Sequence, residues 1–370
     1  MQAVRILLGA IIVCALANAP AFAQQVDDLT ICLIGWRETS PEVAKMSFND
    51  ERKLKACADF LGSGGGSVKD RTDAAVALGQ DWEFKSDAQE SVEEITVSQD
   101  GSVRKQPGQK VNLVDYDHAI AAYGMAIQID PQDTGAYWRR AKALRDARYL
   151  DRALADYSEI IRLKPDDGRP LLDRAGVFRA KGDLKSAISD YSDEIKLNPF
   201  FLDAYQLRGF AYFLNGDYVT AIADYLKANK RANADTSLLL FIARGRNGED
   251  GTEELKANAD RVLAQLWPRQ MIEFFLGTRP AGELVKGEGA EIGFGFPHTY
   301  YHPMVKARCQ SLFYLGEWHL IHKDSAKARA EFREAVASAC PSVSTASDES
   351  GIWEPIQYDG AVAELKRLGQ

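Results

Sequence analysis

The sequence lacks the excess of basic residues that nucleic-acid binding requires. It has 45 Lys and Arg residues against 53 Asp and Glu residues, which gives a formal net charge of −8 at pH 7. Because a phosphate backbone is bound by dense positive charge, this balance excludes nucleic acid as the main partner. The chain is 46% hydrophobic, so it has enough apolar residues to bury a core, and wholesale disorder is excluded as well.

Sequence patterns of common enzymes are also missing. No glycine-rich phosphate loop precedes a predicted helix, and neither a GxSxG nucleophile elbow nor an HExxH zinc motif occurs. The run GSGGGS at residues 62–67 has the composition of a linker. We therefore predict a protein that is not an enzyme, with no catalytic residue, no cofactor and no metal.

Long apolar runs are confined to the N-terminus. Arg5 precedes a run that is too short to span a bilayer, and the triplet Ala-Phe-Ala that follows is typical of a signal-peptidase site. Residues 1–23 are therefore predicted to be a secretory signal that is cleaved after Ala23. The alternative, a lipoprotein signal, needs a small residue before the modified cysteine, whereas a valine precedes Cys14. We expect a periplasmic or secreted chain without a transmembrane segment.

What the sequence does contain is an internal repeat. Three blocks of equal length, 134–167, 168–201 and 202–235, lie end to end and carry the same residue types at the same offsets. Each block has a bulky residue, a small residue, a second bulky residue, an alanine and an aromatic residue in that order. This pattern and block length are typical of the tetratricopeptide repeat, in which two antiparallel helices form a hairpin and the hairpins stack into a solenoid.

Small side chains at fixed offsets explain how such hairpins pack. They let the two helices approach closely, and the aromatic residue of each block fills the space toward the next hairpin. The small residues are Ala141, Ala175 and Gly209 on the predicted first helices, and Ala153, Ala187 and Ala221 on the second helices. We therefore predict an all-α tetratricopeptide solenoid with a C-terminal capping helix.

The same register extends in both directions from the three blocks. Downstream of the signal, the predicted order is an N-terminal helical segment at 24–69, a first hairpin at 70–133 with an inserted loop or short hairpin near 86–113, three consecutive repeats at 134–235, a degenerate repeat and connector at 236–306, and a last repeat with its capping helix at 307–370.

The four cysteines beyond the signal fit this register as two disulfides. Cys309 opens a predicted first helix and Cys340 closes its partner helix, and antiparallel packing brings those two ends together. Cys32 and Cys57 are then left to pair with one another. In an oxidising compartment such cysteines favour bridges over thiol chemistry.

Histidines give the one alternative to a binding protein. His298 and His302 are four residues apart, and His319 and His322 are three apart, which are spacings at which one helix holds a metal. Prolines flank the first pair, however, and His319 falls on a packed position of a predicted first helix. We interpret the four as core and loop histidines, with an enzyme or metal-binding site at 298–322 as the alternative.

A partner surface is predicted on the concave inner face of the solenoid, where first-helix side chains point. Along the chain, the side chains predicted to line this face are first cationic and then aromatic, within a protein of net negative charge. Such a surface suits an extended peptide or a helix with acidic and apolar residues. The alternative is that these are ordinary solvated or packed helix residues. The predicted groove residues are Trp138, Lys142, Arg145, Arg169, Arg179, Phe210 and Phe213.

The C-terminal part resembles a known group of bacterial envelope proteins. LFYLGEWHL at 312–320, AVAELKRLGQ at 361–370 and MIEFFLG at 271–277 are similar to the NlpI-like tetratricopeptide lipoproteins, over roughly residues 115–370. The resemblance implies a non-enzymatic, often dimeric adaptor of the periplasm that docks cell-wall hydrolases or proteases. The chain departs from that group by lacking the lipid-modified cysteine and by the insertion near 86–113.

Overall fold

The chain divides into two compact units, residues 1–143 and 144–370. The computed structural model describes Cys32 and residues 51–90, 96–97, 103–104, 113–231, 233–261, 267–280, 303–337 and 356–369. Two predictions lie outside these residues: the signal at 1–23, and the Cys309–Cys340 bridge, since neither Cys340 nor the side chain of Cys309 is described. Among the described residues, no helix has the length and apolar character needed to cross a membrane.

Three helices with described bounds, and the start of a fourth, lie in the first unit. They are α3 (Glu51–Ser63), α4 (Val68–Glu90), α5 (Leu113–Ile129) and α6 (Thr134–Asp146), the last of which runs across the unit boundary. The predicted disulfide between Cys32 and Cys57 is present, and it ties the N-terminal segment to α3. Helices α4 and α5 pack closely because Gly79 leaves room for the buried ring of Tyr123.

The predicted insertion near 86–113 lies between the two helices of this first hairpin. Helix α4 continues to Glu90, and two strands follow, β1 (Thr96–Val97) and β2 (Val103–Arg104). The strands pair antiparallel, with Thr96 opposite Arg104 and Val97 opposite Val103. The described part of residues 86–113 therefore consists of the end of α4 and a short hairpin, and a short hairpin is one of the two forms expected from the sequence.

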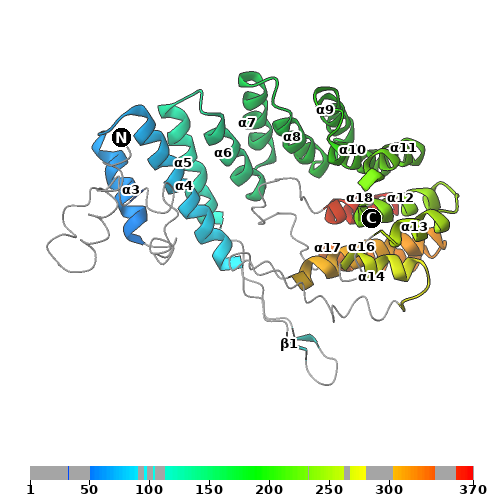
Figure 1. The fold of residues 1–370 in the computed structure, drawn as a ribbon. Helices are drawn as coiled ribbons and strands as arrows, with labels where there is room; N and C mark the ends of the chain where they lie inside the picture. The colour runs from blue at the N-terminus through cyan, green and yellow to red at the C-terminus, as the bar shows by residue number, and fades with distance from the viewer. Residues whose placement is uncertain are drawn as a thin grey trace, which may run out of the picture. The chain divides into compact units, whose positions relative to one another are not determined.

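The second unit is a run of helical hairpins (Figure 1). Three consecutive hairpins, beginning with α6 and α7, use the predicted repeat blocks, and a single-turn 3₁₀ helix at Asn229–Arg231 lies near the end of the third block. In chain order the helices after α6 are α7 (Leu150–Leu163), α8 (Arg169–Ala180), α9 (Leu184–Leu197), α10 (Leu202–Leu214), α11 (Tyr218–Ala228), α12 (Ala234–Arg246), α13 (Thr252–Ala259), α14 (Trp267–Phe275), α16 (Pro303–Ile321), α17 (Ser325–Ala337) and α18 (Ile356–Arg367). The prediction of an all-α tetratricopeptide solenoid is confirmed.

The turns inside the hairpins follow from a Gly-Asp pair. Gly182 and Gly216 have φ angles of 81° and 84°, a left-handed conformation that glycine adopts without a steric penalty and that ends the first helix. Asp183 and Asp217 follow as N-caps of the second helices, each accepting a hydrogen bond from a backbone N–H three residues on. In both hairpins, therefore, a glycine ends the first helix and the aspartate that follows it begins the second helix.

An arginine at the same offset of each repeat links consecutive hairpins. Arg208 on α10 makes a bidentate ion pair with Asp224 on α11, with both N···O distances at 2.7 Å. It also donates a hydrogen bond to the hydroxyl of Ser192 on α9. The preceding hairpin repeats the arrangement with Arg174, Asp190 and Ser158. Hydrogen bonding to Asp224 raises the pKa of Arg208, and the three hydrogen bonds of its guanidinium join the hairpin to its neighbour.

The predicted C-terminal helix is present as α18, and its contacts extend beyond the last hairpin. It packs against α16 and α17, and it also contacts α10. Within this unit it lies between α10 on one side and α16 and α17 on the other (Figure 1). The buried apolar cluster of the unit runs continuously from α8 to α18 and includes Ala361.

Candidate functional site

Three of the predicted groove residues lie on α6. Trp138, Lys142 and Arg145 are four and three residues apart, so they share one face of the helix. Trp138 and Lys142 are partly exposed. Arg145 differs, because its Nε donates to the Asp146 carboxylate at 3.0 Å and only 12% of its side chain is exposed. The α6 face therefore combines one tryptophan and one lysine that are both partly exposed.

A fourth predicted residue, Arg169, lies at the start of α8 and is the most exposed of the set. Its side chain is 81% exposed, and its Nε is 3.6 Å from Asp167. An ion pair this open to water contributes little to stability, so its guanidinium is accessible to an acidic ligand.

The remaining three predicted residues are buried, so the prediction that they form an exposed track is wrong. The side chain of Arg179 is fully buried, with Nη2 3.3 Å from the Asp359 carboxylate on α18. Its guanidinium lies 5.7 Å from the ring centre of Phe210. Phe210 and Phe213 are also completely buried. The sequence register identifies these positions as first-helix positions, but it does not reveal that α18 folds against this part of the solenoid.

A buried ion cluster joins α18 to the hairpins. Arg246 on α12 contacts two carboxylates that are both fully buried: Glu317 on α16 at 2.7 Å and Glu364 on α18 at 3.3 Å. It also donates to the hydroxyl of Tyr218 on α11. Arg367 on α18 pairs with Glu364 and donates to the backbone carbonyl of Leu214 on α10 at 2.7 Å.

This cluster was not predicted from the sequence. The one signal for it is an acidic residue, Glu317, within the apolar run LFYLGEWHL.

The protonation of Glu317 follows from its surroundings. Burial, together with the neighbouring Glu364 carboxylate, raises the pKa of this carboxyl group to about 8 against the opposing effect of Arg246. Within the described part of the chain, no hydrogen-bond donor reaches Oε1 of Glu317. The Arg246 guanidinium therefore faces two buried carboxyl groups, and Glu317 holds its proton more tightly than an exposed glutamate does.

The described histidines are packed against an aromatic ring. The ring of His322 stacks on that of Trp318 at 3.9 Å, and its Nδ1 is 2.8 Å from the Trp318 carbonyl oxygen. Burial lowers the pKa of His319. His298 and His302 lie outside the described residues. Where the structure does describe side chains, no group of three or more His, Cys, Asp or Glu residues is arranged to hold a metal ion.

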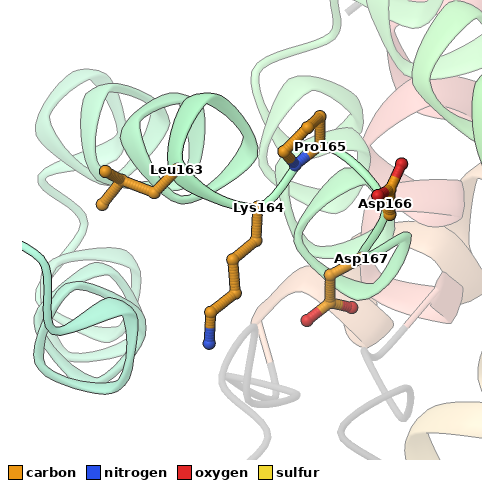
Figure 2. Close-up of a pocket in the computed structure, with 5 residues that line it drawn as sticks. All are labelled: Leu163, Lys164, Pro165, Asp166 and Asp167. Carbon is orange, nitrogen blue, oxygen red and sulfur yellow. The ribbon is translucent and has the colours of Figure 1, made fainter.

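A depression of about 540 Å³ lies at the end of α7 and in the turn that follows it. Figure 2 shows its five lining residues, all from one consecutive stretch of chain, Leu163 to Asp167. No side chain from another described element contributes to its lining. Because binding pockets gather polar groups from several elements around an apolar cavity, this depression is not a candidate site.

Comparison with known proteins identifies the repeat. Residues 172–235 match the family described as tetratricopeptide repeat. No curated protein sequence matches the chain.

Solved structures to which the chain is similar include MamA, YrrB and PilF. MamA is 20% identical over 40% of this chain and 89% of that chain, with a TM-score of 0.38. YrrB, titled a TPR protein with an unusual peptide-binding site, is 14% identical over 59% and 93%, with a TM-score of 0.35. PilF of Pseudomonas aeruginosa is 12% identical over 80% and 99%, with a TM-score of 0.40.

Proposed function

We propose that this chain, a tetratricopeptide-repeat solenoid, is a non-catalytic scaffold that binds other proteins through the first-helix faces of its hairpins. Stacked helical repeats create extended surfaces that suit peptides and helices. The observation that carries the proposal is the α6 face, where Trp138 and Lys142 are partly exposed and one turn apart. An aromatic anchor next to a cation fits a segment with apolar and acidic residues.

The proposal includes export from the cytoplasm. The disulfide between Cys32 and Cys57 supports it, because such bridges persist in oxidising compartments such as the periplasm. A periplasmic adaptor that docks cell-wall hydrolases or proteases, as a monomer or a homodimer, is the form suggested by the resemblance of residues 115–370 to envelope lipoproteins.

The proposal is tested by partner capture from a periplasmic extract with two α6 variants. Lys142→Glu should slow association, and the loss should shrink at high salt, because exposed charges are screened over about 8 Å at physiological ionic strength. Trp138→Ala should instead speed dissociation by about 30-fold, since an aromatic anchor contributes about 2 kcal/mol. Arg145→Glu is unsuitable, because it would place two carboxylates side by side at Asp146.

The matched control is Lys196→Glu on α9, a second helix, where the lysine is 76% exposed and pairs with Asp193. Capture should survive this substitution. If capture survives both α6 substitutions but is lost on deletion of residues 86–113, the insertion is the recognition element and the proposal is wrong.

A further inference from the structure

We propose that the face of the second unit formed by α8, α10, α12 and α16 is a binding site for an amphipathic helix with two acidic residues five positions apart, and that α18 occupies this site as the chain's own copy of that ligand. The inference rests on the proposed function, because it states which kind of protein segment one part of the scaffold binds. A partner helix with the same pattern would compete with α18 for the site.

The first argument is the position of α18 across successive hairpins. It contacts Arg179 on α8, Leu214 on α10, Arg246 on α12 and Phe313 on α16, which are first helices of their hairpins. It also packs against α17, the second helix of the last hairpin, where Arg329 donates to the Leu368 carbonyl. The first helices are those to which the repeat register assigns partner binding. A helix lying across them has the geometry of a helix-in-groove complex made within one chain.

The second argument is charge complementarity. Asp359 and Glu364 on α18 meet the guanidinium groups of Arg179 and Arg246, both at 3.3 Å. The Arg179 side chain is fully buried and that of Arg246 is 13% exposed. A ligand without the first acidic residue would leave the buried Arg179 without this counter-charge, which is strongly unfavourable. A ligand without the second would remove one of the two carboxyl groups that contact Arg246. The site therefore selects for acidic residues at these two positions.

The third argument is the small-residue surface between the two acids. Gly360 is buried, and a Cβ atom added there would lie 2.4 Å from a ring carbon of Phe313. Ala361, the next residue, is completely buried. Val362 and Lys366, by contrast, are exposed. The recognised pattern is thus acidic, glycine, alanine, two variable positions and acidic.

The fourth argument explains why α18 can exchange with a partner. Among the described side chains of α18, Ala361 is fully buried, whereas Ala363 and Leu365 pack against the apolar core but are only partly buried, so none of these side chains is a large, completely buried hydrophobic group. Its docking also places Glu364 beside Glu317, two buried carboxylates that share Arg246. Such burial offsets much of the ion-pair attraction. A segment of another protein with better apolar anchors can therefore displace it.

The test uses the full chain and a fluorescently labelled peptide of residues 356–370. Gly360→Val should weaken docking of α18 and leave the site itself intact, because residue 360 belongs to the ligand helix. In anisotropy titrations, this variant should bind the peptide at least about tenfold more tightly than the wild type does, since its internal competitor is removed. A Glu364→Lys peptide should not bind, whereas a control Lys366→Ala peptide should bind like the parent.

The proposal is overturned if the Gly360→Val protein keeps its helical content yet does not bind the peptide, or binds the Glu364→Lys peptide equally well. Should this variant fail to fold, hydrogen exchange on the wild type decides. Amides of α18 should exchange at least about tenfold faster than those of α16 and α17, because an exchangeable ligand helix opens on its own. Equal protection would make α18 an integral part of the core and end the proposal. Neither assay uses a natural partner, so their failure is distinct from failure of partner capture by α6.

Discussion

Replacing Gly316 with alanine probes the close helix approach on which each hairpin depends. Gly316 on α16 occupies the small-residue position of its repeat, facing the fully buried ring of Phe332 on α17. A Cβ atom at residue 316 would lie 2.4 Å from that ring. The equivalent Gly209 is less crowded, since its added Cβ would lie 3.0 Å from the ring of Tyr225. The two positions form a matched pair.

The expected magnitudes follow from two opposing effects. Alanine is more favourable than glycine inside a helix by about 1 kcal/mol. Overpacking a dense core costs about 1–3 kcal/mol. At Gly316 the Phe332 ring must move by about 1 Å to reach ordinary carbon–carbon contact, so overpacking dominates. At Gly209 a smaller shift suffices, and the two effects nearly cancel.

Thermal unfolding of the two variants measures the difference. Because the added Cβ at residue 316 lies so close to the ring, overpacking there falls in the upper part of its range, about 2–3 kcal/mol. Gly316→Ala should therefore lose about 1–2 kcal/mol of stability after the helix-propensity gain is subtracted, which is a fall in Tm of about 2–8 °C for a unit of this size. Gly209→Ala should stay close to the wild type. If Gly316→Ala is as stable as the wild type, or if Gly209→Ala loses more, the helices do not approach as described.

Two further predictions concern charged groups. Arg208→Ala should lower the free energy of unfolding in urea by about 2 kcal/mol, because it leaves the buried Asp224 carboxylate without its counter-charge. Lys196→Ala, which removes an exposed pair, should change that free energy by less than about 0.5 kcal/mol. Equal losses in the two variants would argue against the link between hairpins. For Glu317, burial holds the pKa near 8 and unfolding returns it toward 4.5, so the folded chain binds more protons than the unfolded chain between these values. As pH rises from about 5 to 8, the Tm of the wild type should therefore fall relative to that of Glu317→Gln, and above about pH 8 the difference between the two Tm values should stay constant. A Tm difference that does not depend on pH would contradict this.

The repeat architecture could be predicted because its determinants are local and periodic. Ala141, Ala175 and Gly209 recur at the same offset of each repeat, and all three are buried where their helices meet a partner. The bridge between Cys32 and Cys57 could also be predicted, once the other two cysteines were assigned to one hairpin.

The arginine links between hairpins also have a signal in the sequence. Arg174 and Arg208 occupy the same offset in consecutive repeats, and so do their aspartate and serine partners. An alignment of the charged residues across the blocks, in addition to the apolar ones, would have revealed these arginine links. Periodic polar residues are thus as informative about a stack of repeats as the apolar pattern is.

The place of α18 could not be predicted, because it depends on contacts distant in sequence. The run AVAELKRL is amphipathic and indicates a helix, but nothing in its pattern shows which surface it covers. That choice depends on Arg179 and Arg246, each far along the chain from its acidic partner on α18. For the same reason, the register treated Arg179 and two phenylalanines as exposed groove residues, whereas they are buried.

Site-specific photo-crosslinking in the native cell tests most directly whether a first-helix face binds protein. A photoreactive residue is placed at Lys142 on α6 or, as the matched control, at Lys196 on the second helix α9. Our account predicts covalent adducts with other proteins from position 142 and none from position 196. Adducts formed from position 196 alone would contradict it.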